Sequence, residues 1–144
     1  MIIGKYPSLR LRRSRKDPWS RRLIQENTLS PNDFILPIFL IEGSNKRQEI
    51  SSMPGVYRYT INRMSQIVDK AIKLGIPMIA LFPKTQNSKK NELGTESLNE
   101  NNLVCKAIQE VKKRYKNQIG IMCDVALDPY TCLLYTSDAA DDPA

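Results

Sequence analysis

Histidine is absent from the 144-residue sequence, and cysteine is scarce. The three cysteines, Cys105, Cys123 and Cys132, form no C-x-x-C pair. These shortages argue against a zinc finger, a disulfide scaffold, and any catalytic triad or metal centre built on histidine. Sparse and unpaired cysteines are also typical of proteins from a reducing compartment.

Long apolar runs are lacking as well. No stretch approaches the roughly 18 apolar residues that a transmembrane helix needs, and Met1–Gly4 is too short for the core of a signal peptide. The Arg- and Ser-rich stretch that follows resembles a transit peptide in composition only, because no amphipathic pattern supports it. With 41% hydrophobic residues and a mean hydropathy of −0.41, the sequence predicts a cytoplasmic globular protein with no membrane partner.

The formal net charge of +7 is unevenly distributed. Residues 1–33 carry eight basic and three acidic residues, whereas residues 132–144 carry three Asp and no basic residue. The basic stretch Arg10–Lys16 could bind nucleic acid or an acidic membrane surface. Because it lacks interleaved aromatic residues and a known nucleic-acid motif, we favour an arm that docks on a partner subunit or stays solvated. We therefore expect no nucleic-acid partner.

Hydrophobic periodicity predicts alternating strands and helices. Apolar runs over 34–41, 78–82 and 119–125 predict three buried strands. Apolar residues at helical spacing over 64–72 and 103–111 predict two helices between those strands. This order is typical of a parallel α/β fold. Because three strands with two crossovers cannot close a barrel, we expect the first strands of a larger domain, a piece that is not stable alone.

Three segments are expected along the chain. Residues 1–33 form a basic arm with a short helix, in which Asp17 is the N-cap and Pro18 takes the first helical position. Residues 34–131 form the α/β part. Residues 132–144 show neither helical period nor strand alternation, and they resemble a peptide found at the ends of metagenomic gene predictions, where adapter DNA has been translated. We expect this tail to be an artefact; the alternative is a genuine flexible C-terminus.

One residue conflicts with the strand predicted over residues 34–41. Pro37 lies inside the first apolar run, and a proline normally marks an edge strand or a bulge.

Residues 51–56 and 84–99 are predicted to be loops, the second of them strongly polar. The simplest expectation is that the lysines of the second loop are solvated: Lys84, Lys89 and Lys90.

Asp124 is the strongest candidate for a functional residue. It ends the third apolar run, at the carboxyl edge where α/β folds place ligands. A carboxylate there is unfavourable unless it is paired, metal-bound or protonated, although an Asp that caps the next helix or turn explains it equally well. Asp128 follows in an Asp-Pro turn signal, for which turn formation is the stronger explanation. Together the two carboxylates could hold Mg²⁺ through oxygen ligands and waters, whereas Cys105 and Cys123 are expected to be buried small hydrophobic residues.

Ordered motifs run over almost all of residues 6–131. They include the basic arm, a first strand that contains proline, Met-Pro-Gly-Val-Tyr-Arg at 53–58, and Ala-Leu-Phe-Pro at 80–83. The last motif is Asp-Val-Ala-Leu-Asp-Pro-Tyr-Thr at 124–131. In this order and spacing they resemble the porphobilinogen synthase (5-aminolevulinate dehydratase) family, whose active-site segment is nearly identical to the last motif.

The resemblance implies a TIM (β/α)8 barrel, of which this chain holds the N-terminal part, about three strands, after an extended arm. Members join two molecules of 5-aminolevulinate into porphobilinogen, a precursor of haem and other tetrapyrroles, through Schiff bases on two lysines of later strands. Neither lysine lies in this chain, so we expect the chain alone to be inactive. Asp124 matches a family active-site carboxylate close to the substrates, where a role in proton transfer is reasonable.

The resemblance also indicates a metal class and a partner. Zinc-type members carry cysteines at the positions of Ala126 and Asp128, and a hard oxygen ligand at Asp128 suits Mg²⁺ rather than Zn²⁺. No organic cofactor is implied. The family's His- and Gly-rich continuation after Thr131 is replaced by the tail, so part of the metal site is not encoded here, and Cys132 is not the missing ligand. Because the family's arm wraps a neighbouring subunit, a homo-oligomer is implied, usually an octamer.

Two other hypotheses stay open. The chain could belong to another Schiff-base lyase or aldolase with a TIM barrel, which the positions of its lysines beyond residue 131 would distinguish. It could also be a basic module that binds nucleic acid through residues 10–22, in which case binding would fall steeply with salt.

Overall fold

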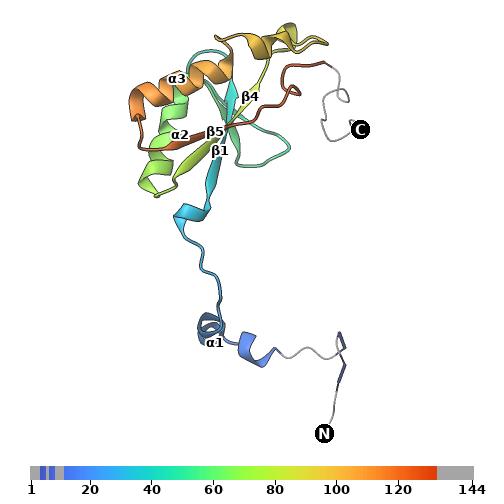
Figure 1. Cartoon of the computed structure of the whole chain (residues 1–144), viewed down its shortest axis with the longest axis vertical. Helices are drawn as coiled ribbons and strands as arrows, with labels where there is room; N and C mark the ends of the chain where they lie inside the picture. The colour runs from blue at the N-terminus through green and yellow to red at the C-terminus, as the bar shows by residue number, and fades with distance from the viewer. Residues whose placement is uncertain (1–3, 6, 9–11, 133–144) are drawn as a thin grey trace. The chain divides into compact units, whose positions relative to one another are not determined.

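The computed structural model describes residues 4–5, 7–8 and 12–132, and the chain divides into two compact units, Met1–Ser30 and Pro31–Ala144 (Figure 1). Most of the tail expected to be an artefact, residues 133–144, lies outside the described residues. No helix of the described residues is long and apolar enough to span a membrane.

The first unit contains a 3-10 turn, Arg13–Arg15, and the short helix α1, Pro18–Leu23. As predicted, Asp17 is the N-cap residue and Pro18 begins the helix, where its missing N–H removes no intrahelical bond. The Arg21 guanidinium donates hydrogen bonds to the carbonyls of Arg15 (3.0 Å) and Lys16 (2.8 Å), which fixes the turn against the helix.

The second unit is built on a five-stranded sheet of order β2-β3-β1-β4-β5. Strands β1 (Ile35–Ile41), β4 (Met78–Lys84) and β5 (Gly120–Cys123) are parallel neighbours. Helix α2 (Ile61–Lys73) connects β1 to β4, and helix α3 (Leu103–Tyr115) connects β4 to β5. The three predicted strands and the two predicted crossover helices are therefore confirmed.

A short hairpin adds two strands that the sequence did not predict. Strands β2 (Arg47–Glu49) and β3 (Tyr57–Tyr59) pair antiparallel, and β3 continues the sheet parallel to β1. The sheet therefore contains the three predicted parallel strands and these two short additional ones. Each strand has only three residues, and β2 is polar and exposed throughout, so neither produces an apolar run.

Pro37 lies in a regular strand because part of β1 is a sheet edge. On one side β1 pairs with β4 along its whole length, including Pro37 with Ala80. On the other side β3 pairs only with Phe39 and Leu40. Proline is tolerated at such an edge because its missing N–H breaks no hydrogen bond of the sheet.

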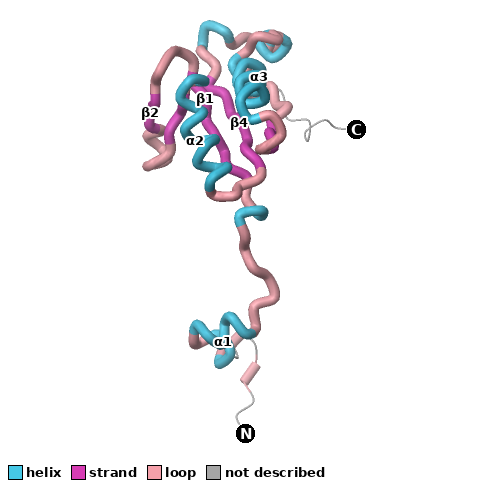
Figure 2. Tube along the Cα trace, turned by 90° about the vertical axis from the view of Figure 1, so that its left-hand side faces the viewer, coloured by secondary structure: helices cyan, strands magenta, loops and turns pink. Residues whose placement is uncertain are grey.

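Helices α2 and α3 cover the same face of the sheet (Figure 2). The core between them and the strands is apolar and almost inaccessible to solvent. Gly75 ends the α2 segment with a φ of +75°, a conformation in which glycine avoids the steric penalty of a Cβ atom. The main core residues are Ile38, Leu40, Met64, Val68, Ile79, Leu81, Ala107 and Val111.

The opposite face of the sheet has no helical cover among the described residues. Its side chains alternate with those of the core along each strand. Large apolar residues remain exposed there, including Ile35 (45% exposed), Phe82 (36%) and Met122 (45%). In a closed barrel this would be the inward face, which other strands would cover.

Candidate active site

The carboxyl ends of the parallel strands carry the polar residues of the candidate site. Glu42 follows β1, Thr85 follows β4, and Asp124 follows β5 directly. Asp124 is exposed, as is Met122 two residues earlier, whereas Cys123 between them is half-buried. This alternation places Asp124 on the uncovered face of the sheet.

The segment after Asp124 folds into a tight turn. The N–H groups of Tyr130 and Thr131 donate to the carbonyl of Leu127, at 2.8 and 3.0 Å. Both residues are buried, and burial raises the pKa of the Tyr130 phenol. Asp128, in the same turn, is exposed. The turn predicted for the Asp-Pro pair is therefore present, with Asp124 just before it.

The loop after β4 holds this turn in place. Asn91 forms an isolated parallel bridge with Thr131, and its N–H donates to the carbonyl of Tyr130 at 3.3 Å. The Asn91 amide donates to Thr95 Oγ1 at 2.5 Å and accepts from the Thr95 N–H at 3.1 Å. These bonds fix the shape of the loop around Asn91, which contacts the turn through Tyr130 and Thr131.

Gly94 provides the space that this contact requires. Its φ is +60°, and a Cβ atom at this position would lie 3.3 Å from Cγ2 of Thr131 and 3.5 Å from Cδ2 of Leu127. A side chain at position 94 would therefore strain the backbone and crowd the turn that contains Leu127 and Thr131. The glycine couples the shape of the loop to the placement of the turn.

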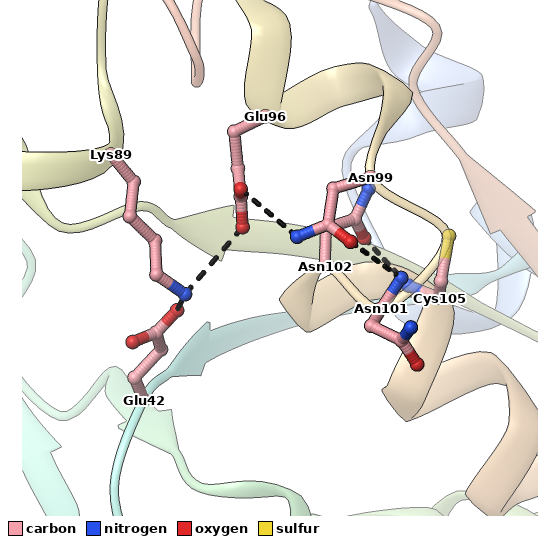
Figure 3. Close-up of polar contacts among 7 residues, drawn as sticks. All are labelled: Glu42, Lys89, Glu96, Asn99, Asn101, Asn102 and Cys105. Atoms are coloured by element: carbon pink, nitrogen blue, oxygen red, sulfur yellow. Dashed lines mark hydrogen bonds and ion pairs between the residues drawn. The ribbon is translucent and has the colours of Figure 1, made fainter.

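An ion-pair cluster ties the same loop to the end of β1 (Figure 3). Lys89 Nζ lies 2.5 Å from Glu42 Oε1 and 3.5 Å from Glu96 Oε1. The hydrogen bond that Lys89 donates to Glu42 is the main cause that raises the pKa of Lys89, and the charges of both carboxylates add to it, against the lowering effect of burial. Lys89, which was predicted to be solvated, is thus ion-paired, while 38% of its side chain stays exposed to solvent.

Asparagines extend the cluster to the start of α3 (Figure 3). Asn99 Nδ2 donates to Glu96 Oε2 at 3.1 Å, and its Oδ1 accepts from the Asn101 N–H at 2.9 Å. Asn102 is the N-cap of α3, and its Oδ1 accepts from the Cys105 N–H at 2.9 Å. The sequence analysis predicted the helix but not this N-cap, although an Asn directly before an apolar helical pattern is a recognised start signal.

The two predicted carboxylates do not form a closed metal site by themselves. Within residues 4–5, 7–8 and 12–132, no group of three or more Asp, Glu, Cys or His side chains is arranged to hold a metal ion. Asp124 and Asp128 bracket one short segment, and both are exposed. Cys123 and Cys105 are half-buried thiols, and burial, with a smaller effect of Cys105, raises the pKa of Cys123.

The sequence matches the family "Delta-aminolevulinic acid dehydratase" over residues 8–135. A relative of that name from Bradyrhizobium diazoefficiens is 50% identical over 124 residues, which cover 86% of this chain and 35% of the relative. A chloroplastic relative from Arabidopsis thaliana is 42% identical over 125 residues, covering 86% of this chain and 29% of the relative.

A crystal structure of delta-aminolevulinic acid dehydratase (porphobilinogen synthase) from Toxoplasma gondii, in complex with the reaction product porphobilinogen, is similar in fold. The TM-score is 0.76 at 35% sequence identity, over 86% of this chain and 35% of that chain. The chain thus spans about a third of the length of the first relatives it matches. The observed sheet, with one face uncovered, fits part of such a barrel, and the chain belongs to the delta-aminolevulinic acid dehydratase family.

Proposed function

We propose that this chain is the N-terminal part of a porphobilinogen synthase, a lyase that condenses two molecules of 5-aminolevulinate into porphobilinogen for haem and tetrapyrrole biosynthesis. The observation that carries the proposal is the placement of the 124–131 segment. It sits at the carboxyl edge of the parallel strands, where barrel enzymes hold their substrates. The related Toxoplasma structure contains the product of this reaction.

In this proposal Asp124 transfers protons at the reacting centre. It is exposed on the uncovered face of the sheet, so a substrate held against that face can reach its carboxylate. The two lysines that form Schiff bases belong to later strands of the full-length protein. Residues 34–131 would then supply one wall of the active site and the scaffold of the first strands.

We also infer that the metal of the full-length enzyme is Mg²⁺. Asp128 and Asp124 offer carboxylate oxygens, the donors that Mg²⁺ takes together with waters. Ala126 offers no ligand where zinc-type members have a cysteine, so a thiolate site is not available in this segment. When bound, the ion would supply positive charge close to Asp128. No organic cofactor is required by the proposal.

Residues 1–33 are proposed to be an arm that docks on a second copy of the protein, in an assembly that is octameric in the full-length form. The exposed apolar residues of the first unit support this, since Trp19 is 63% and Leu23 is 80% exposed in the isolated chain. Neither a nucleic acid nor a membrane is a partner in this proposal. The enzyme is placed in the cytoplasm, while the Arabidopsis relative is named as chloroplastic.

We further propose that residues 34–131 are the native barrel segment and that residues 132–144 are not native sequence. The family match covers residues 8–135 and so leaves out residues 136–144, most of this tail. Sequencing the parent DNA across codons 120–150 tests this. Adapter sequence from about codon 132 is the expected result, and ordinary coding sequence through this region would contradict it.

The enzymatic proposal is tested with the full-length gene product that contains this segment. We expect the purified protein to form a pyrrole from 5-aminolevulinate with Mg²⁺ present, and to lose activity when the metal is chelated. An Asp124→Asn variant should lose about 10²-fold or more in kcat, the usual contribution of a positioned acid or base. Absence of pyrrole from a folded wild-type protein would overturn the proposal.

A further inference from the structure

The last turns of helices α2 and α3 lie at the amino edge of the parallel strands, opposite the candidate active site. Each helix returns the chain to the amino end of the next strand, so α2 ends before β4 and α3 ends before β5 (Figure 1). Side chains join the two ends, since the Tyr115 hydroxyl donates to Asp69 Oδ1 at 2.7 Å and Arg114 lies 3.5 Å from Asp69 Oδ2. Residues 69–73 and 110–116 therefore form one surface, which we call the amino-edge surface.

The amino-edge surface is strongly basic, with six basic side chains and two acidic ones. One of the acidic groups, Asp69, is already bonded to Arg114 and Tyr115, and the other is Glu110. Asp33, which comes before β1, adds one more acidic group at this edge of the sheet. The lysines of the surface are all exposed: Lys70, Lys73, Lys112, Lys113 and Lys116.

Two of these lysines flank the contact between the helices. Lys73 lies one helical turn beyond Asp69, so it is on the side of α2 that faces the end of α3. Lys116 directly follows Tyr115, whose hydroxyl makes that contact. Among the described residues, neither ammonium group has an ion-pair partner. Both charges are therefore available to a ligand.

The helix dipoles account for only part of this charge. Each helix end carries about half an elementary negative charge, so the two ends together offset about one of the excess cations. Lys116 lies just beyond the last helical residue and has a φ of +52° and a ψ of −112°. Because the Gln118 N–H donates to the Tyr115 carbonyl at 3.0 Å, Lys116 is the first central residue of a turn that normally has glycine there. A lysine in a strained backbone conformation indicates a use for its side chain.

We infer that the amino-edge surface docks an acidic segment of a partner protein. Charge complementarity favours such a segment, because several carboxylates can pair with the lysines at once. The surface spans the ends of two packed helices, whose axes lie about 8–10 Å apart, and this width suits a single extended peptide. The arm of a second copy has the wrong sign to bind here, since residues 10–16 are basic. The inference goes beyond the proposed function and does not depend on it.

Two other anionic partners fit the surface less well. Its aromatic side chain, Tyr115, is 6% exposed and therefore cannot stack on the bases of a single strand. Leu74, at the end of α2, is 54% exposed, but one leucine buries too little apolar area to hold a protein in a membrane interface. An acidic peptide needs neither an aromatic platform nor an apolar anchor.

The test uses the full-length protein and two labelled peptides, one of alternating Glu and Ser and one of alternating Gln and Ser. Fluorescence anisotropy at low ionic strength should show binding of the Glu peptide only. The double variant Lys73→Gln/Lys116→Gln should weaken this binding about tenfold, the combined effect of two exposed charge pairs. The control variant Lys46→Gln/Lys106→Gln removes two charges from exposed positions elsewhere and should bind as wild type does. Equal losses in both variants, or no binding to wild type, would overturn the inference.

Lys116→Gly separates the charge from the strain. It should slow amide hydrogen exchange at Gln118, because glycine relieves the turn, and it should still weaken the Glu peptide about threefold. Lys116→Arg should keep the affinity. Affinities unchanged in Lys116→Gly and in Lys73→Gln would contradict the inference.

Two further measurements identify the partner class and keep the proposed function separate. If a single-stranded oligonucleotide or anionic vesicles bind more tightly than the Glu peptide, and lose affinity in the Lys73→Gln/Lys116→Gln variant, the surface belongs to that partner and the inference fails. Porphobilinogen formation should be the same in this variant as in wild type, because the surface lies at the opposite edge of the strands from Asp124. The outcome of the peptide test is thus independent of whether the protein makes porphobilinogen.

Discussion

At the scale of single residues, the placement of the 124–131 segment depends on small groups outside it. Asp124 itself is simply the residue after a strand, and its position follows from where β5 ends. The turn that follows is held by Asn91, Gly94 and Thr95 of a loop that is separated from it by all of α3. Mutations in that loop should therefore affect the face of the proposed active site without contacting a substrate.

Gly94→Ala tests this coupling. A Cβ atom meets Thr131 at 3.3 Å while the backbone has a φ of +60°, so the change should destabilise the loop by about 1–3 kcal/mol. In the full-length protein we expect faster amide hydrogen exchange at Asn91 and Thr131 and a lower kcat.

Gly55→Ala is the matched control, because Gly55 also has a positive φ (+80°) but has nothing within 4 Å of a Cβ atom. Both variants carry backbone strain, and only Gly94→Ala disturbs the turn. Equal effects of the two changes on hydrogen exchange at Thr131 would contradict the proposed coupling.

At the scale of secondary-structure elements, the contact between α2 and α3 includes a buried phenol. Tyr115 is 6% exposed, and its hydroxyl donates to Asp69 Oδ1 at 2.7 Å, with the Ser65 carbonyl at 3.1 Å. Burial raises the pKa of Tyr115 to about 12 from 10.0, and the hydrogen bond and charge of Asp69 add to the effect. The neutral phenol is therefore the form that stabilises the fold.

This predicts a pH-dependent contribution to stability. Because the folded-state pKa is above the unfolded value, the stabilisation is complete below pH 10 and is lost as the pH rises to about 12. Tyr115→Phe should destabilise the α2–α3 contact by about 1 kcal/mol at neutral pH, and should remove this part of the alkaline loss. Hydrogen exchange of α3 amides in the full-length protein, measured from pH 7 to 11, checks both effects. A difference between wild type and variant that stays constant up to pH 11 would contradict the pKa argument.

The Lys89 cluster connects β1, the loop after β4, and the start of α3. Lys89→Met should loosen the loop and increase hydrogen exchange around Asn91, while the strands keep their protection. The side chain of Lys89 is 38% exposed, so we expect a loss of no more than about 1 kcal/mol. Lys113→Met is the control, and an equal effect in both variants would show that the cluster does not hold the loop.

The regular elements were predictable because each carries its own periodic signal. The helices α2 and α3 and the strands β1, β4 and β5 all follow from runs and spacings within a dozen residues. The hairpin was missed because β2 is polar and is stabilised only by pairing with β3. The Lys89–Glu42 pair joins residues 47 positions apart, a contact that depends on the finished fold. Asp124 was located correctly by its place after a strand, while its catalytic role stays a prediction.

At the scale of the whole molecule, the sheet has a packed face and an apolar face without helical cover among the described residues. This predicts that the isolated 144-residue chain forms no porphobilinogen, since it holds only one wall of the proposed site. It should also bind the dye ANS more strongly than the full-length protein does, because Ile35, Phe82 and Met122 remain accessible. Measurable turnover by the isolated chain would refute the proposed division of the active site.

The short contact between β3 and β1 has a consequence for how such a chain is made. In the proposed full-length protein, this sheet would leave the ribosome before any later strand is made, and an open strand edge is a template for aggregation. The hairpin already occupies β1 at Phe39 and Leu40, and Pro37 interrupts the row of donors on the remainder. In that protein β1 would thus be partly protected from pairing with a wrong strand until the strand that completes the fold has been synthesised.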